Sequence, residues 1–242
     1  MITLDKKTTV LFYGDSITHG GRLQSMDGNH IIGHGYQSII ASKLGFDNIE
    51  NMPKFINKGV SGDSIAQMYA RLNYDVIKNK PDIISILAGI NDVGKGLGMP
   101  YKMTTDKYIG IFQMMINDIR KLLKNTKIII CEPFYLELNC FENPYENTPY
   151  ALCEPYFNPG FVQENREKML EMRKEITYMQ QELKKFAQKN ECIYVPLQEE
   201  FIKASEKAAP EYLIWDTVHP TIVGHELIAR KWLEVVEKEF NK

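Results

Sequence analysis

One serine in this sequence lies where a nucleophile could work. The apolar run Thr9–Tyr13 has the composition of a buried strand, and the tripeptide Gly14–Ser16 follows it directly. A residue at the carboxyl end of a buried parallel strand faces the edge of the sheet where ligands bind. Serine is also a common N-cap residue of helices, so this position alone leaves both interpretations open.

An aspartate and a histidine near the C-terminal end could activate that serine. Asp216 and His219 form an Asp-x-x-His motif just before the amphipathic stretch Thr221–Phe240. A serine hydroxyl is a weak nucleophile until a base takes its proton, and histidine titrates near neutral pH. A carboxylate beside the imidazole can orient it and stabilise its cation. One local turn could supply both groups.

Two more short motifs follow strand-like runs. Asn57–Gly62 follows the run Lys54–Asn57, and Gly89–Asp92 follows the run Ile83–Ala88. Parallel sheets bind ligands beyond the carboxyl ends of their strands. We therefore expect these motifs to meet the serine and the histidine at one edge of a sheet.

The elements that must position these motifs alternate along the chain. Strand candidates are Thr9–Tyr13, Lys54–Asn57, Ile83–Ala88, Lys127–Glu132 and Cys192–Pro196. Helix candidates are Tyr36–Leu44, Ser64–Lys78, Asp106–Lys124, Gln163–Lys189 and Thr221–Phe240. Strand alternating with helix predicts an α/β fold with a parallel sheet that is covered on both faces. The length of 242 residues fits one domain over residues 1–242.

Taken together, the motifs resemble the pattern of the SGNH (GDSL) hydrolases. That pattern is Gly-Asp-Ser, a glycine in a second block, Gly-x-Asn-Asp and then Asp-x-x-His. It occurs here in the same order, at Gly14–Ser16, Gly62, Gly89–Asp92 and Asp216–His219. The resemblance implies a three-layer α/β/α sandwich of the flavodoxin-like type, with a central parallel five-stranded sheet. It also implies a serine esterase that needs no cofactor.

The resemblance assigns roles to five residues. It implies a triad of Ser16 as nucleophile, His219 as base and Asp216 as the carboxylate that orients the base. The oxyanion of the tetrahedral intermediate needs preorganised donors. The resemblance assigns these to the backbone N–H groups of Ser16 and Gly62 and to the side-chain amide of Asn91.

Further stretches narrow the resemblance to bacterial acetylxylan esterases and related carbohydrate deacetylases. Among them are the strand exit Glu132–Phe134 and the segment Trp215–Pro220. This subgroup implies removal of acetyl groups from sugars or oligosaccharides such as acetylated xylo-oligosaccharides. We name Asp15, Arg22 and Trp215 as candidate substrate-binding residues. A lysophospholipase or thioesterase on the same scaffold stays open, and so does a non-catalytic carbohydrate-binding module.

Two other features have competing interpretations. A second Gly-Asp-Ser at Gly62–Ser64 begins an amphipathic stretch, so we expect Ser64 to be an N-cap rather than a nucleophile. The segment Phe134–Phe161 is rich in aromatic residues and proline. It could pack on its own domain, form an oligomer contact or line one wall of a substrate cleft.

Composition and charge limit the partners. A net charge of −2 does not favour nucleic acid, and no long apolar run predicts a membrane span or a leader peptide. We expect a cytoplasmic enzyme, with homo-oligomer formation left open. No metal-ligand spacing is present, so no metal is expected. Cys131 and Cys192 are predicted to be reduced, whereas Cys140 and Cys153 share a loop and could meet, with two free thiols favoured.

Overall fold

The computed structural model describes residues 2–23, 27–28, 30–94, 103–139 and 159–241. In this part of the chain, a single five-stranded sheet has the order β2-β1-β3-β4-β5, and every neighbouring pair is parallel. The strands are β1 (Thr9–Gly14), β2 (Lys54–Gly59), β3 (Ile83–Leu87), β4 (Lys127–Cys131) and β5 (Ile193–Val195).

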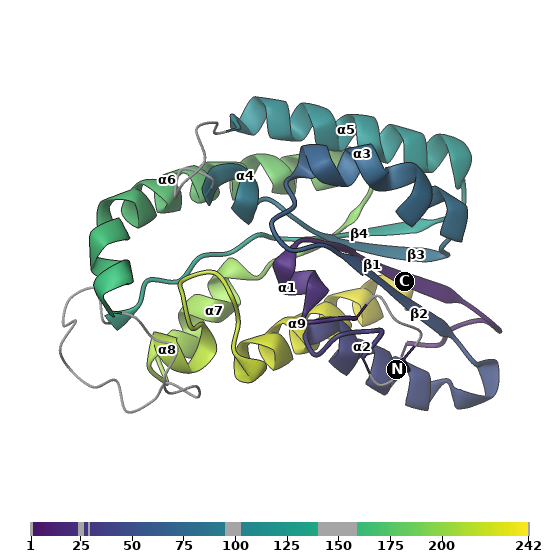
Figure 1. Cartoon of the computed structure of the whole chain (residues 1–242). Helices are drawn as coiled ribbons and strands as arrows, with labels where there is room; N and C mark the ends of the chain where they lie inside the picture. Colours follow the sequence, from purple (N-terminus) through teal and green to yellow (C-terminus); the bar gives the residue numbers. More distant parts are fainter. Residues whose placement is uncertain (1, 24–26, 29, 95–102, 140–158, 242) are drawn as a thin grey trace.

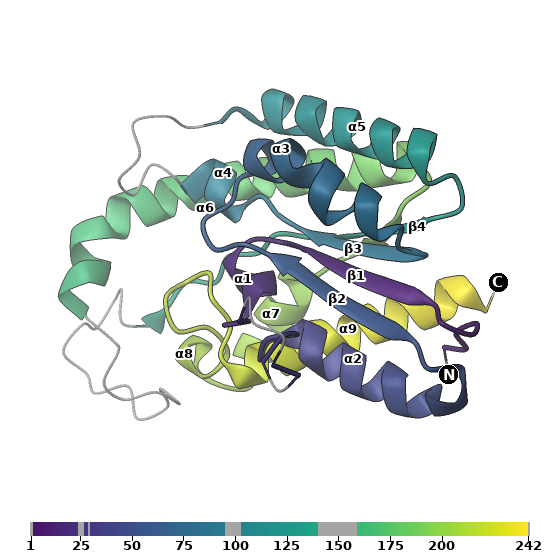
Figure 2. The ribbon, with the colours of Figure 1, turned by 45° about the vertical axis from the view of Figure 1, so that its right-hand side comes forward.

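Helices cover both faces of this sheet. Figures 1 and 2 show α3, α5 and α6 on one face and α2 and α9 on the other. The helices are α1 (Ser16–His19), α2 (Tyr36–Asp47), α3 (Ile65–Asp75), α4 (Ile90–Gly94), α5 (Thr105–Leu122), α6 (Pro159–Lys189), α7 (Gln198–Ser205), α8 (Pro210–Leu213) and α9 (Ile222–Phe240), with short 3-10 turns at Ile49–Asn51 and Ile77–Asn79.

The central strands are apolar throughout because both of their faces are covered. Every residue of β3 is buried, and in β1 all but the first are. Phe12 of β1 packs against Trp232 of α9, and the Trp232 indole N–H donates to Ser85 Oγ at 2.9 Å. This bond satisfies the one polar atom of a fully buried tryptophan.

The strand register brings the carboxyl ends of three strands level with one another. Gly14, the last residue of β1, pairs with Gly59 of β2 and with Leu87 of β3. The segments that follow these three strands therefore leave the sheet side by side. The serine motif begins at the last residue of β1, the motif Asn57–Gly62 continues from β2, and Gly89–Asp92 follows β3.

The predicted fold class is confirmed, and the five strands and five long helices lie close to the predicted ranges. The long helix α6 begins at Pro159 rather than at the predicted Gln163. Proline is tolerated in the first turn of a helix, because the N–H group that it lacks would have no partner there. The short helices α1, α4, α7 and α8 were not predicted.

The aromatic-rich segment is described only at its two ends. Phe134 and Tyr135 are buried in the core, which supports packing on the chain's own domain for these two side chains. Residues 140–158, with Cys140 and Cys153, lie outside the described residues. Cys131 and Cys192 are free thiols as predicted, and burial raises the pKa of Cys131 to about 12. None of the helices in the described ranges has the length and apolar character needed to cross a membrane.

Candidate active site

The serine motif forms a tight turn from β1 into α1. Ser16 is the first residue of α1, and Asp15 is its N-cap, accepting from the Ile17 N–H at 3.0 Å. A Cβ atom at Gly14 would lie 2.3 Å from Thr18 Oγ1 and 2.4 Å from the Leu87 carbonyl oxygen. Only glycine allows the strand to turn so closely over its neighbour, and this turn presents Ser16 at the sheet edge.

The histidine and its carboxylate come from one local turn before α9. Asp216 Oδ1 accepts from the backbone N–H groups of Val218, at 3.2 Å, and His219, at 2.7 Å. The Trp215 N–H donates to the His219 carbonyl at 3.1 Å, which closes the turn. Thr221 then caps α9 through its hydroxyl. The turn therefore holds both functional side chains through its own backbone.

The structure brings Ser16, His219 and Asp216 into one hydrogen-bonded chain. Ser16 Oγ lies 2.7 Å from His219 Nε2, and His219 Nδ1 lies 2.6 Å from Asp216 Oδ2. A carboxylate can only accept, so Nδ1 carries the hydrogen of a neutral imidazole and Nε2 is left to accept from the serine hydroxyl. This arrangement can deprotonate Ser16 for attack on an ester or amide carbonyl.

The surroundings of His219 favour its charged form. Burial alone would lower the pKa of His219, but the hydrogen bond and charge of Asp216, together with the charge of Asp15, raise it above the ordinary value. A base whose cation is stabilised in this way takes a proton more readily from a weak acid such as a serine hydroxyl.

The two remaining oxyanion candidates lie together beside the serine turn. Gly62 has φ +82°, and a Cβ there would meet nothing within 4 Å, so its backbone is open to approach. Asn91 of α4 donates from Nδ2 to the carbonyl of Asp63, the residue after Gly62, at 3.1 Å. The Val60 N–H donates to the Gly14 carbonyl at 3.0 Å and joins this loop to the serine strand. The role of these groups as oxyanion donors stays a prediction.

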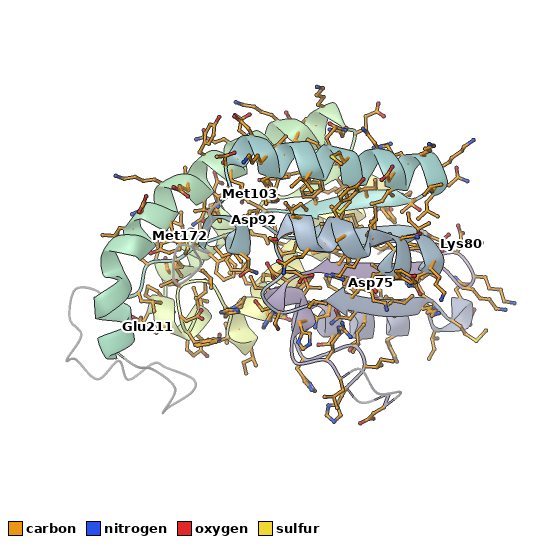
Figure 3. The ribbon with its side chains drawn as sticks, turned by 45° about the horizontal axis from the view of Figure 1, so that its top comes forward. Asp75, Lys80, Asp92, Met103, Met172 and Glu211 are labelled. Carbon is orange, nitrogen blue, oxygen red and sulfur yellow. The ribbon has the colours of Figure 1, made fainter. Side chains whose placement is uncertain are left out.

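Two other polar residues of the motifs, Asp92 and Asn57, stabilise loop backbones. Both carboxylate oxygens of Asp92 accept from the Ile65 N–H, at 3.1 and 3.2 Å, so this α4 residue caps α3 (Figure 3). Asn57 donates to the carbonyls of Thr18 and Ile32, each at 2.8 Å. These bonds join the segments that follow β1, β2 and β3 to one another.

The candidate substrate-binding residues have three different environments. Asp15 is 1% exposed, so its carboxylate cannot contact a substrate. The expectation that Asp15 binds substrate is therefore wrong, and the residue instead caps α1. Arg22 Nε donates to the Gly59 carbonyl at 2.9 Å, and any contact with a substrate stays a prediction. Trp215 is 45% exposed and stacks on the His219 ring, with 5.4 Å between ring centroids and 19° between planes.

Ser64 is the N-cap of α3, as predicted. Its backbone N–H and its hydroxyl both donate to Gln67 Oε1, each at 2.9 Å. His30 and His34 contact each other at 3.1 Å, an arrangement that stabilises the loop after α1. No group of three or more potential metal ligands occurs among the residues for which the structure gives positions.

Sequence reasoning missed Arg71 and Asp63. Arg71 of α3 is 19% exposed, and its Nε lies 2.6 Å from Asp63 Oδ2 beneath the Gly62 loop. The sequence carries no clear signal for this pair. An arginine in an amphipathic helix is expected on the solvated face, and nothing in its spacing marks it as buried.

Known proteins resemble this chain over most of its length. The sequence model of the GDSL-like Lipase/Acylhydrolase family matches residues 12–227. An acetylxylan esterase from Geobacillus stearothermophilus is 29% identical over 237 residues, which cover 96% of this chain and 94% of that protein.

Two solved structures show the same sandwich. The crystal structure of a catalytic mutant of Axe2, an acetylxylan esterase from Geobacillus stearothermophilus, has a TM-score of 0.77 at 27% identity and covers 96% of this chain and 95% of its own. The crystal structure of a proposed GDSL-like lipase from Parabacteroides merdae has a TM-score of 0.76 at 29% identity, with 97% of each chain covered. The five-stranded parallel sheet flanked by helices matches the fold of these proteins.

Proposed function

Because this chain belongs to the GDSL-like lipase/acylhydrolase family and is a carboxylic ester hydrolase, we propose that it is a serine esterase that removes acetyl groups from sugar hydroxyls. The observation that carries the mechanism is the hydrogen-bonded chain from Ser16 Oγ through His219 to Asp216, with links of 2.7 and 2.6 Å. The substrate class is supported by the similarity to acetylxylan esterases and by the exposed Trp215 beside the base.

The reaction proceeds in two halves through an acyl-enzyme. His219 Nε2 takes the hydroxyl proton as Ser16 Oγ attacks the acetyl carbonyl carbon, and the carbonyl oxygen becomes an oxyanion. The N–H groups of Ser16 and Gly62 and the Asn91 amide stabilise that charge. When the intermediate collapses, the protonated His219 gives its proton to the departing sugar oxygen. The acetyl group stays on Ser16.

The second half repeats these steps with water. His219 takes a proton from the water that attacks the acetyl carbonyl, and it returns the proton to Ser16 Oγ as acetate leaves. Asp216 accepts no proton in either half of the reaction and stabilises the imidazolium in both. The raised pKa of His219 agrees with that role.

The position of Trp215 supports a sugar as the leaving group. The departing oxygen must lie within hydrogen-bond reach of His219 Nε2, so the rest of the alcohol lies close to the indole stacked on that ring. Aromatic faces pack against the C–H faces of sugar rings, while nearby polar groups bind the hydroxyls. An exposed indole at this place therefore favours a sugar as the alcohol part of the ester.

The test compares acyl chain length with alcohol identity. We expect kcat/KM to fall steeply from acetate through butyrate to octanoate aryl esters, and acetylated xylo-oligosaccharides to exceed aryl acetates of equal leaving-group reactivity, since remote sugar contacts can be used in the transition state. A preference for octanoyl esters or acyl-CoA, without acetate release from oligosaccharides, would establish a lysophospholipase or thioesterase instead. If a fluorophosphonate does not label Ser16 at all, the protein would instead be a non-catalytic carbohydrate-binding module.

Trp215→Ala refines this test. We expect kcat/KM on acetylated xylo-oligosaccharides to fall about 5- to 10-fold, because one aromatic contact contributes about 1 kcal/mol. Phe46→Ala is the matched control, since Phe46 is an aromatic side chain of α2 that is 78% exposed. If the two substitutions lower kcat/KM equally, Trp215 does not contact the substrate.

A further inference from the structure

Arg71 joins the chain segments that carry the oxyanion candidates. Its guanidinium extends from α3 and lies 4.4 Å from the centre of the Tyr13 ring. Nη2 donates to the Gly14 carbonyl at 3.1 Å, and Nη1 donates to the Lys58 carbonyl at 2.7 Å. The same side chain thus binds the ends of β1 and β2. A half-buried cation with several matched acceptors holds them in a fixed geometry.

The third link of Arg71 is the ion pair with Asp63. Its Nε lies 2.6 Å from Asp63 Oδ2, and the two side chains are only 19% and 10% exposed. Breaking a pair that is this well buried leaves an uncompensated charge on the surviving partner. Without Arg71, the Asp63 carboxylate would turn toward water and move its own backbone.

The backbone of Asp63 fixes the positions of two oxyanion candidates, the Gly62 N–H and the Asn91 amide. Its N–H donates to the Val60 carbonyl at 3.2 Å and closes the turn that contains Gly62. Its carbonyl accepts from Asn91 Nδ2 at 3.1 Å. An amide nitrogen has two hydrogens, so this bond fixes the Asn91 amide and leaves one donor for an oxyanion. A shift of Asp63 therefore displaces both donors together.

From these contacts we propose that Arg71 is a positioning residue, which holds the Gly62 N–H and the Asn91 amide in place through Asp63. This inference rests on the proposed esterase mechanism and adds a residue that touches neither substrate nor triad. Transition-state stabilisation by fixed donors is sensitive to small displacements, because the donors must meet the oxyanion rather than the ground-state carbonyl. Loss of Arg71 should therefore lower kcat and leave KM nearly unchanged.

The experiment measures kcat and KM on 4-nitrophenyl acetate for Arg71→Met, well below each variant's unfolding temperature. We expect kcat to fall about 10- to 100-fold, with KM within about threefold of the parent value. Arg71→Lys should retain part of the rate, since an ammonium can still reach one acceptor. Asp63→Asn should retain a similar part of the rate, because the Asn side-chain oxygen can still accept a hydrogen bond from Arg71 Nε although the ion pair is lost.

Two matched controls separate positioning from folding. Arg120 of α5 also donates to backbone carbonyls, those of Asn190 and Glu191 before β5, at the opposite end of the sheet. Arg120→Met should lower stability and leave kcat unchanged. Asp75, at the end of α3 (Figure 3), accepts from Arg71 Nη1 at 2.6 Å, whereas Asp63 binds Nε. Asp75→Asn should likewise leave kcat unchanged.

The outcomes distinguish this inference from the proposed function. Arg71→Met together with Asn91→Ala should lose much less than the product of the two single losses, because Arg71 acts partly through Asn91. Parent-like kcat in Arg71→Met, or a fully multiplicative double variant, would overturn the positioning role. If Arg71→Met does not fold, then Arg71→Lys and Asp63→Asn decide, and a parent-like kcat in both overturns it. Absence of esterase activity in the parent protein would instead overturn the proposed function.

Discussion

The buried carboxyl group of Asp15 gives a prediction that can be worked through in numbers. Asp15 is 1% exposed, its Oδ1 accepts from the Ile17 N–H at 3.0 Å, and its Oδ2 lacks a hydrogen-bond partner among the described residues. Burial raises the pKa of Asp15 from 3.8 to about 6, although the Ile17 N–H and the charge of His219 oppose the shift. The folded protein therefore binds this proton more tightly than the unfolded chain does.

The sign of the effect on stability follows from that difference. Because the folded pKa is the higher one, the stabilising contribution of the protonated carboxyl is complete below about pH 4 and is lost as the pH rises through about 6. A difference of about 2 between the two pKa values corresponds to about 3 kcal/mol, since one pKa unit is about 1.4 kcal/mol. Asp15→Asn keeps an oxygen for the Ile17 N–H and removes the titration.

The assay is urea unfolding of the parent protein and Asp15→Asn between pH 4 and pH 7. We expect the free energy of unfolding of the parent to fall by about 2.5 kcal/mol relative to the variant over this range, because the unfolded chain is already partly ionised at pH 4. Contributions of titrating groups that do not interact with Asp15 cancel in the difference, whereas the titration of His219 shifts with it. A difference that stays constant with pH would refute the reasoning, because it would mean that Asp15 has an ordinary pKa in the folded protein.

The same variant has a second readout in catalysis. The charge of Asp15 is one of the causes that raise the pKa of His219. Asp15→Asn should therefore move the acidic limb of the kcat/KM profile to lower pH. A higher KM with an unmoved limb would instead support the substrate contact that the burial of Asp15 excludes.

Three further predictions concern the site. In the parent protein, the acidic limb of the kcat/KM profile should lie above pH 6.5, since His219 must be neutral to act as a base and its pKa is raised from 6.5. An acidic limb well below pH 6.5 would contradict the contact between His219 and Asp216. Asn91→Ala should lower kcat about 100-fold or more with little change in KM, and a large KM change at constant kcat would make Asn91 a binding residue. Ser64→Ala should keep kcat and lose about 1 kcal/mol of stability as a missing cap, whereas an inactive variant would move the nucleophile to Ser64.

Much of the fold could be predicted because its elements carry periodic patterns. The central strands are continuous apolar runs, and the long helices are amphipathic over several turns. The short helices α1 and α4 could not be recognised in this way. Each begins within a motif and has 4 or 5 residues, too few to show a helical period.

The site could be predicted only as far as its motifs extend. The strand ends place the serine, asparagine and histidine motifs at one edge, and the structure brings Ser16, His219 and Asp216 within hydrogen-bond distance. The burial of Asp15 could not be foreseen, because it depends on side chains from other elements that cover the turn. Arg71 was missed for the same reason, since two of its partners are backbone carbonyls at the ends of β1 and β2.

The central claim is that Ser16 forms the covalent acyl-enzyme with His219 as its base. Its most direct test is peptide mapping of the parent protein, Ser16→Ala, Ser64→Ala and His219→Ala after reaction with a fluorophosphonate. We expect one adduct, on the peptide that contains Ser16, in the parent protein and in Ser64→Ala. We expect none in Ser16→Ala and strongly slowed labelling in His219→Ala. An adduct on another residue of the parent protein, or undiminished labelling and ester hydrolysis in Ser16→Ala, would contradict the claim.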